Sequence, residues 1–216
     1  VRDDRPFDLV SPRSGEVLKT VNARSLWQKI LETRLQTGEP YLLFSDAVNR
    51  ALPKHQRELG LKVTSSNLCC EITLPTGVDH LGNERTAVCC LASMNLETWD
   101  DWREKPGLVE DVLRFLDNVL TRFIETAPEG MARAAYAAMR ERSVGLGAMG
   151  FHSFLQSKGI PFESALAKSW NLKMFRKLRR DADAASVMLA HESGECPDAA
   201  ERGRASRNCH KLAIAP

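Results

Sequence analysis

Apolar residues recur every three or four positions along four stretches of the chain, and this spacing predicts amphipathic helices. The first helix is expected to begin after Asn22, a favourable N-cap residue, and to end at Gly38. The other three are expected at residues 108–125, 130–142 and 163–191. The second half of the chain is therefore predicted to be rich in helix.

Extended segments are expected mainly in the first half. A short apolar run at residues 41–44 suits a buried strand, and residues 64–76 and 86–96 are rich in small or β-favouring residues. The stretch between these two, residues 77–84, is dense in turn formers, so we predict two extended segments joined by a turn region. A last strand is expected at residues 212–214.

The glycine-rich segment Gly145 to Gly150 matches the dinucleotide-binding pattern G-x-G-x-x-G. That pattern binds phosphates only where a strand precedes it and a helix follows, so that the phosphates meet the helix N-terminus. Here an Ala- and Arg-rich helix is expected before it, and only Ser143 and Val144 remain for a strand. We therefore interpret the glycines as a tight junction between two helices.

The chain has 216 residues, enough for one large domain or a slice of a bigger one. Its net charge of +2 is too small to indicate a nucleic acid or an anionic membrane as partner. No apolar stretch approaches the ~20 residues of a membrane helix, and no signal peptide opens the chain, so we expect a cytoplasmic protein with no membrane partner. The chain starts at Val1 and stops at Pro216 without a terminal tail, and we interpret residues 1–216 as a single partial domain of a longer protein.

Six cysteines are available for redox chemistry, metal binding or burial, since structural disulfides are rare in cytoplasmic proteins. The doublets Cys69-Cys70 and Cys89-Cys90 could supply four thiolates to zinc. Zinc sites, however, normally use C-x-x-C on a turn, whereas adjacent cysteines in an extended chain point apart, so no metal site is predicted. Cys209 beside His210 is interpreted as a buried cysteine rather than as a nucleophile.

Asn67, Cys69 and Glu71 are spaced two residues apart, so in an extended backbone their side chains point to the same side. An amide, a thiol and a carboxylate would then share one face. In a straight strand Asn67 and Glu71 would stand roughly 13 Å apart, so the chain must bend near Cys69 if all three serve one substrate. The spacing also fits a half-buried strand in which the cysteines act as small apolar residues, and it does not choose between the two.

Longer motifs resemble those of one enzyme family. The run Ser66 to Thr76 (SNLCCEITLPT) resembles the S-N-L-C-x-E-I-x-L-P-T motif of class I ribonucleotide reductase large subunits. Residues 86–96 (TAVCCLASMNL) are similar to its A-x-C-x-L-x-S/A-x-N-L segment, and residues 144–151 (VGLGAMGF) to its G-[LI]-G-x-x-x-F segment. Residues 207–216 resemble the approach to its phosphate-binding loop. The four matches follow family order across most of the chain.

The resemblance implies a ten-stranded α/β barrel whose radical cysteine lies on a loop through the barrel centre. Cys69 matches the cysteine that becomes a thiyl radical and removes the 3′-hydrogen of the ribonucleotide substrate. Glu71 matches the general base for the 3′-hydroxyl proton, and Asn67 matches the residue that orients the ribose hydroxyls. Ser66 falls with Asn67 and Glu71 among the substrate-binding positions. Cys89 matches one cysteine of the pair that ends as a disulfide.

The resemblance also implies what lies outside this chain. A separate small subunit with a metal site would generate the radical, thioredoxin or glutaredoxin would reduce the complete protein, and the complete subunit would be a homodimer. ATP and deoxynucleotide effectors would bind to other parts of the protein, and the redox partner of Cys89 would also lie there. This chain alone is therefore expected to be inactive, and it is expected to bind no cofactor of its own. Two alternatives stay open: a cobalamin-dependent class II reductase, and a non-catalytic helical binding module whose cysteines are merely buried.

Overall fold

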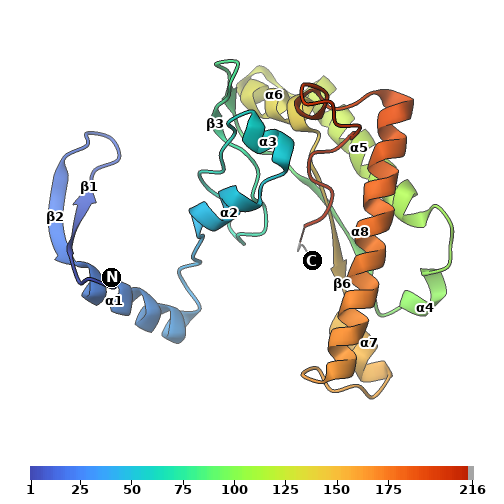
Figure 1. Ribbon diagram of the computed structural model, residues 1–216, viewed down its shortest axis with the longest axis horizontal. Coiled ribbons are helices and arrows are strands. Elements are labelled where there is room, and N and C mark those ends of the chain that lie inside the picture. The colour runs from blue at the N-terminus through green and yellow to red at the C-terminus, as the bar shows by residue number, and fades with distance from the viewer. Residues whose placement is uncertain (214–216) are drawn as a thin grey trace. The chain divides into compact units, whose positions relative to one another are not determined.

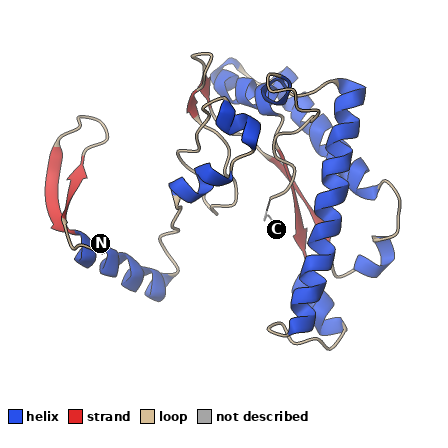
Figure 2. Cartoon of the chain, viewed as in Figure 1, coloured by secondary structure: helices blue, strands red, loops and turns tan. Residues whose placement is uncertain are grey.

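The structure is a computed structural model that describes residues 1–213, and its chain divides into two compact units. Unit 1 comprises Val1–Leu43 and unit 2 comprises Phe44–Pro216, of which the last three residues are not described. Figure 1 labels the elements along the chain, and Figure 2 shows unit 1 as a hairpin and a helix and unit 2 as mainly helical. Each unit is described by itself.

Unit 1 is an antiparallel hairpin followed by one helix. Strand β1 (Pro6–Val10) pairs with β2 (Val17–Asn22), and helix α1 (Ala23–Thr37) follows directly. The predicted caps of α1 are confirmed, because Asn22 accepts a hydrogen bond from the Ser25 amide and Gly38 adopts the left-handed conformation, φ 80°. The hairpin was not predicted from the sequence. None of the described residues 1–43 is fully buried, so its strands carry no inward-facing apolar pattern of the kind that identifies a strand.

The strand predicted at residues 41–44 is wrong. Residues 41–43 form no regular element, and Phe44 instead precedes helix α2 (Ser45–Ala51). A strand is stabilised by a neighbouring strand, and among the described residues none pairs with this segment. The apolar run was therefore not sufficient to define a strand.

Unit 2 continues with short elements and then long helices. Helix α3 (Lys54–Glu58) is followed by a long loop and by the two-residue strands β3 (Gly77–Val78) and β4 (Glu84–Arg85), which form a small hairpin. The later elements, in chain order, are β5 (Cys90–Asn95), α4 (Trp99–Trp102), α5 (Leu108–Thr126), a 3₁₀ turn (Glu129–Met131), α6 (Ala132–Glu141), β6 (Val144–Met149), α7 (Phe151–Ser157), α8 (Ala165–Ser193) and α9 (Pro197–Ala200). The three helices predicted beyond residue 107 are confirmed with small shifts at their ends.

The core of unit 2 forms where α5 packs against α8 and against the parallel pair β5–β6 (Figure 1). Helix α5 buries one stripe at helical spacing, including Leu113, Leu116 and Leu120, each at most 2% exposed. Burying one such leucine contributes about 1.5–3 kcal/mol, so this stripe is a major part of the stability of the unit. Helix α8 faces it with alternating large and small residues, among which Ala182 and Ala185 allow close approach.

The glycine-rich segment forms strand β6 itself, so the predicted junction between two helices is wrong. Cys90 pairs with Val144 at one end of the β5–β6 ladder, and Asn95 pairs with Met149 at the other. A β-carbon at Gly145 would lie 2.3 Å from Leu91 Cδ2 and 3.0 Å from Cys89 Sγ, so a larger residue there requires these side chains to shift. Gly145 and Gly147 lie inside the strand, and only Gly150 follows it, as the N-cap of α7. The first two glycines therefore do not form the phosphate-binding turn of a dinucleotide site, which comes after the strand.

The strand predicted at residues 212–214 is found in part. Leu212 forms a parallel bridge with Leu146, and the Ala213 amide donates to the Leu146 carbonyl at 3.2 Å. The last segment therefore runs along the side of β6 that β5 does not occupy. Ile214 lies outside the described residues.

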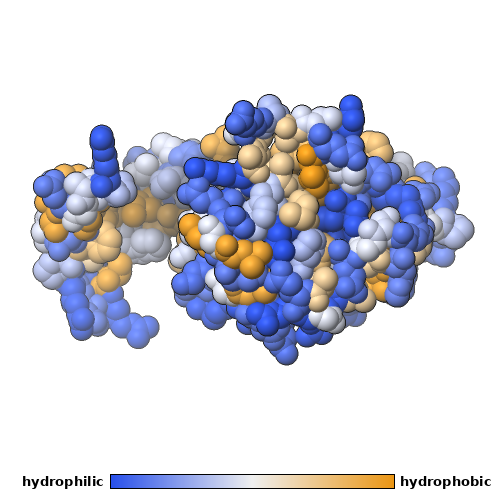
Figure 3. Space-filling model, turned by 90° about the horizontal axis from the view of Figure 1, so that it is seen from above, coloured by the Kyte–Doolittle hydropathy of each residue, from blue (hydrophilic) through white to orange (hydrophobic). Residues whose placement is uncertain are grey.

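Apolar side chains also remain on the surface, where Figure 3 shows orange patches among the blue hydrophilic residues. Examples are Leu35 of α1, 89% exposed, and Phe115 of α5, 63% exposed. The described core thus leaves part of the apolar surface of these helices uncovered.

Candidate active site

The motif-bearing segment from Lys62 to Thr76 forms a loop whose two ends are held together. At its base the Thr76 amide donates to the Lys62 carbonyl at 3.0 Å, and the hydroxyls of Thr64 and Thr76 are 2.6 Å apart. Farther along, the Ser66 hydroxyl donates to the Ile72 carbonyl at 2.7 Å. These successive hydrogen bonds join the two arms of residues 62–76 and make the loop narrow, with Cys69 near its tip. We call residues 62–76 the finger loop.

Asn67 closes the tip of the finger with both ends of its side-chain amide. Its Nδ2 donates to Glu71 Oε1 at 2.5 Å, and its Oδ1 accepts from the Ile72 amide at 3.0 Å. The Asn67 carbonyl accepts a turn-closing hydrogen bond from the Cys70 amide, and Cys70 adopts a left-handed conformation with φ 61°. These contacts bring the first and last residues of the Asn-x-Cys-x-Glu spacing together.

The chain therefore turns at Cys69, and the prediction that residues 64–76 form an extended segment is wrong. Residues 68–70 are a turn, so side-chain alternation along a strand does not decide which groups share a face. The bend required for a shared substrate is present. Cys69 itself is exposed, and its neighbour Leu68 is 89% exposed, so neither side chain is packed into an apolar core.

One oxygen of Glu71 is left without a partner. Oε1 accepts the Asn67 hydrogen bond, while Oε2 is buried and has no hydrogen-bond partner within residues 1–213. A buried acceptor without a donor is costly, and such atoms mark places where a ligand or water completes the pairing. The free oxygen can accept a proton or a hydrogen bond from a hydroxyl group.

Ser66 uses its hydroxyl within the finger. It donates to the Ile72 carbonyl and lies 3.2 Å from Asn67 Oδ1. Its role in substrate binding stays a prediction, and its observed role is to support the turn that carries Asn67.

Cys89 lies immediately before β5, against the close-packed start of β6. A β-carbon at Gly145 would be 3.0 Å from Cys89 Sγ, so the sulfur rests on the glycine backbone. Burial is the main cause, and negative charge on Cys90, Glu141 and Glu71 a smaller one, of a Cys89 pKa raised to about 12. At neutral pH Cys89 is therefore a protonated thiol.

Cys90 differs from Cys89 in its surroundings. It is the first residue of β5, pairs with Val144 and packs against the main core, and burial raises its pKa. Cys90 therefore contributes to the packing of β5 against the main core.

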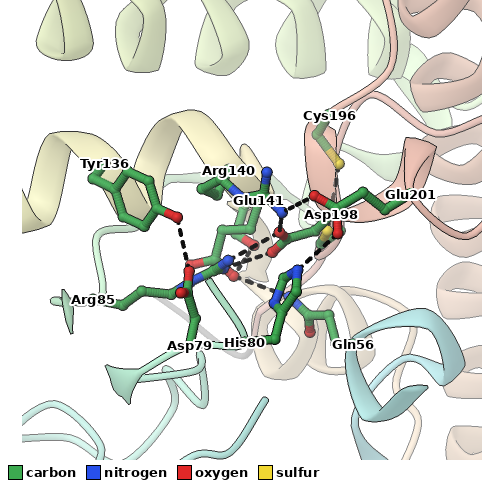
Figure 4. A network of polar contacts seen from close by, with 12 residues as sticks. Gln56, Asp79, His80, Arg85, Tyr136, Arg140, Glu141, Cys196, Asp198 and Glu201 are labelled. Carbon is green, nitrogen blue, oxygen red and sulfur yellow. Dashed lines mark hydrogen bonds and ion pairs between the residues drawn. The ribbon is translucent and has the colours of Figure 1, made fainter. Parts of the chain in front are cut away.

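A buried ionic network, which the sequence analysis missed, holds the β3–β4 hairpin to α6 and α9. Arg85 donates to Asp79 Oδ2 at 2.9 Å and makes two hydrogen bonds to Asp198, at 2.6 and 3.0 Å (Figure 4). Arg140 adds ion pairs to Asp198 and Glu201. Burial alone would raise the pKa of Asp79, but hydrogen bonds from Asn83, Arg85, Tyr136 and Leu81 outweigh it and lower this pKa to about 2.

Glu141 lies fully buried at the end of α6 beside this network. Its Oε2 accepts hydrogen bonds from Gln56 and Ser143, each at 3.1 Å, while Oε1 has no partner among the described residues. Burial raises the pKa of Glu141 to about 8. No spacing in the sequence indicates these contacts, because they join residues as far apart as Arg85 and Asp198.

Comparison with known proteins identifies the family. The model of the ribonucleotide reductase barrel domain matches residues 8–212, and the chain belongs to this family. The predicted fold class, an α/β segment of a ribonucleotide reductase barrel, is confirmed. Within residues 1–213 the strands do not close a barrel, as is consistent with part of that fold.

Individual relatives agree with the family. The chain is 50% identical over 213 residues to the putative ribonucleoside-diphosphate reductase large subunit of Frog virus 3 (isolate Goorha), covering 97% of this chain and 36% of that protein. It is 45% identical over 210 residues to the ribonucleoside-diphosphate reductase large subunit of Invertebrate iridescent virus 3, covering 97% and 32%. The chain thus spans about a third of the length of these relatives.

A solved structure supports the same family assignment. The Actinobacillus ureae class Id ribonucleotide reductase alpha subunit matches with a TM-score of 0.80 and 38% sequence identity, over 89% of this chain and 36% of that one. Residues 1–213 hold neither a membrane-spanning helix nor a clustered metal site. No helix there is long and apolar enough to cross a membrane, and no group of three or more His, Cys, Asp or Glu side chains is placed to hold a metal ion.

Proposed function

We propose that the complete protein reduces ribonucleotides, as ribonucleoside diphosphates, to 2′-deoxyribonucleotides by thiyl-radical chemistry. The observation that carries the proposal is the finger loop, in which Asn67 and Glu71 are hydrogen-bonded across a turn that exposes Cys69. The relatives named ribonucleoside-diphosphate reductase large subunit support the substrate class. The family match runs across both compact units, which supports residues 1–216 as one partial domain.

Each finger residue has a part in the proposed reaction. The Cys69 thiyl radical takes the 3′-hydrogen atom of the ribose, which leaves a carbon radical on the sugar. Glu71 takes the 3′-hydroxyl proton, and the 2′-hydroxyl then leaves with a proton as water. Two electrons reach the sugar from a cysteine pair that includes Cys89 and becomes a disulfide, and Cys69 finally returns the hydrogen atom.

The geometry of the Glu71 carboxylate supports these proposed roles. Asn67 holds one oxygen of Glu71, which fixes the direction of the other oxygen toward a ligand. Positioning of this kind lowers the entropic cost of bringing base and hydroxyl together. We assign Ser66 with Asn67 and Glu71 to the substrate-binding surface of the loop.

The protonated state of Cys89 fits a reductant that must keep its hydrogen until the substrate radical forms. With a pKa of about 12, only a very small thiolate fraction exists at neutral pH, so Cys89 does not react with electrophiles prematurely. Its redox partner is expected in another part of the protein.

The radical is proposed to come from a separate metal-containing small subunit, as in a class I enzyme. The likeness to a class Id alpha subunit favours this over a cobalamin-dependent class II enzyme. The same proposal includes thioredoxin or glutaredoxin as the reductant and a homodimeric large subunit. It also includes ATP and deoxynucleotide effectors bound in other parts of the protein, and a cytoplasmic location. A requirement of the full-length protein for adenosylcobalamin would contradict the class I assignment.

The decisive experiment replaces one sulfur in the full-length subunit. Cys69→Ser should fold, as judged by circular dichroism, yet lose all measurable reduction of ribonucleoside diphosphates in the presence of the small subunit. Cys70→Ser is the matched control, because Cys70 lies next to it in the same turn, and it should retain activity. Turnover by a folded Cys69→Ser protein would instead favour a non-catalytic module.

A further inference from the structure

A second pair of cysteines lies outside the finger loop in sequence and has no part in the reaction described above. Cys196 Sγ and Cys209 Sγ are 3.4 Å apart, and both residues are free thiols. Cys196 is fully buried and Cys209 is 5% exposed. A disulfide has an S–S length of ~2.05 Å, so an approach of about 1.4 Å would join them.

The surrounding backbone already holds the two cysteines together. Cys196 is the residue before α9, and its amide donates to the Ser206 carbonyl at 3.1 Å. The Cys209 amide donates to the Glu141 carbonyl at 2.9 Å. The two sulfurs and Ala199 form a small apolar cluster, so the thiols face each other rather than solvent.

A histidine from a distant part of the chain contacts one of the sulfurs. His55 Nε2, on α3, lies 3.2 Å from Cys209 Sγ. Burial lowers the pKa of His55, so its ring is neutral at pH 7 and can accept a proton. The neighbouring His210 does not compete for this contact, since it bonds Gln56 Oε1 at 2.8 Å.

The pair is reachable from one side. Cys209 and His55 line an open pocket of about 790 Å³, together with Arg204, Lys211 and other residues of this region. Cys196 is not part of the pocket lining. A small molecule entering the pocket would therefore meet Cys209 first, with His55 beside it.

We propose that Cys196 and Cys209 form a second redox dithiol, which a small hydroperoxide oxidises to a disulfide with His55 acting as the base. The geometry gives the three groups distinct roles: Cys209 is the sulfur that meets the peroxide, His55 takes its proton, and Cys196 is the resolving sulfur behind it. This site does not depend on ribonucleotide reduction.

The oxidation balances in two steps. In the first, Cys209 Sγ loses its proton to His55 and attacks one peroxide oxygen; the O–O bond breaks, and the leaving oxygen departs as water with that proton. In the second, Cys196 Sγ attacks the Cys209 sulfenic acid; the S–O bond breaks, and a second water leaves with the Cys196 proton. With hydrogen peroxide as the oxidant, the two thiols are oxidised and the peroxide is reduced to two waters; an alkyl hydroperoxide would leave as one alcohol and one water. Burial, and the hydrogen bond that it donates to Cys196, raise the pKa of the Cys209 thiol well above its ordinary value, so Cys209 attacks only as His55 removes its proton. The same hydrogen bond lowers the pKa of Cys196 against the effect of burial.

Oxidation would constrain the segment that follows Cys209 and lies beside β6. Residues 210 and 211 accept hydrogen bonds from the amides of Val144 and Leu146. A disulfide at Cys209 would tie the start of this segment to the residue before α9. The disulfide therefore closes residues 196–209 into a covalent loop beside the barrel strands.

The experiment uses the reduced full-length subunit treated with a few equivalents of hydrogen peroxide, then alkylated and digested with trypsin. Cleavage after Arg180, Arg202, Arg207 and Lys211 should give residues 181–202 joined to residues 208–211 by a disulfide. The joined peptides should be absent before peroxide, and should disappear after reduction. Recovery of both peptides in alkylated form from the peroxide-treated, folded protein would overturn the proposal.

Variants test the assigned roles. Cys196→Ser and Cys209→Ser should each abolish the joined peptides, while Cys70→Ser should still give them. His55→Gln should slow the linkage at least about tenfold, whereas His191→Gln, an exposed histidine on α8, should not change its rate. An unchanged rate in a folded His55→Gln protein would overturn the role of His55. Because the readout is a peptide link, loss of reductase activity would not affect the result.

Discussion

The side-chain amide of Asn67 donates a hydrogen bond of 2.5 Å to Glu71 Oε1, across a turn that carries Cys69. The two residues would stand roughly 13 Å apart in a straight strand. The hydrogen bond can form only because the chain reverses direction sharply between these residues. The reversal brings the Glu71 carboxylate and the exposed Cys69 thiol into one turn. Most of the proposed chemistry depends on this reversal.

The first prediction removes the amide. Asn67→Ala deletes the bonds to Glu71 and to the Ile72 amide, so the carboxylate loses its orientation. A misplacement of about 1 Å can cost ~10²-fold in rate, so turnover by the full-length enzyme should fall at least about a hundredfold while the protein remains folded. Asn171→Ala, on the exposed face of α8, is the control and should retain wild-type turnover. Equal activity of the two variants would show that Asn67 does not orient the base.

The second prediction concerns the close packing of β5 on β6. Gly145→Ala would place a methyl group 2.3 Å from Leu91 Cδ2 and 3.0 Å from Cys89 Sγ. Overpacking of this kind typically costs about 1–3 kcal/mol of unfolding free energy, measurable as a lower midpoint of thermal unfolding. Gly130→Ala should change stability by less than about 1 kcal/mol, because a β-carbon there meets nothing within 4 Å. A Gly145→Ala protein as stable as the control would contradict the packing.

The third prediction concerns thiol reactivity. With a pKa of about 12, raised by burial, Cys89 has about one thiolate in 10⁴ molecules at pH 8. Brief treatment of the folded subunit with iodoacetamide at this pH should therefore label the exposed Cys69 well before Cys89, as measured by peptide mapping. Raising the pH toward 10 should increase the labelling rate of Cys89 about tenfold per pH unit. Early labelling of Cys89 at pH 8 would contradict its burial.

The fourth prediction concerns stability and pH. Burial raises the pKa of Glu141 from 4.5 to about 8, so between these values the folded protein binds a proton that the unfolded chain has released. The stabilising contribution of the protonated carboxyl is therefore complete below about pH 4.5 and is lost as the pH rises to about 8. Glu141→Gln stays neutral, so from pH 5 to 8.5 wild type should lose stability relative to this variant, by a few kcal/mol at most. Thermal unfolding of both proteins across this range measures the difference, and parallel pH profiles would exclude the effect.

Local patterns were sufficient for the long helices. The cap residues Asn22 and Gly38 define α1, and the apolar spacing around Leu113 and Leu120 defines α5, because these signals act within a few residues of one another. The motif around Cys69 was also recognisable from sequence, as was the need for a bend if Asn67 and Glu71 share a substrate.

Local patterns failed where a residue's state depends on a distant neighbour. Gly145 was assigned to a junction between helices because only Ser143 and Val144 were left for a strand before it, yet it pairs with Leu91 of β5 as part of β6. The hairpin β1–β2 was missed because neither strand is buried.

The sequence by itself determined the family and the long helices and supplied the candidate reacting groups, since motif order and helical spacing are properties of contiguous residues. Only the tertiary structure decided that residues 144–149 are a strand, that Arg85 lies between Asp79 and Asp198, and that Cys196 meets Cys209 beside His55. The physical reason is that parallel pairing, buried ion pairs and sulfur contacts gain their stability from groups brought together by folding. No spacing along the chain encodes which of these groups will meet.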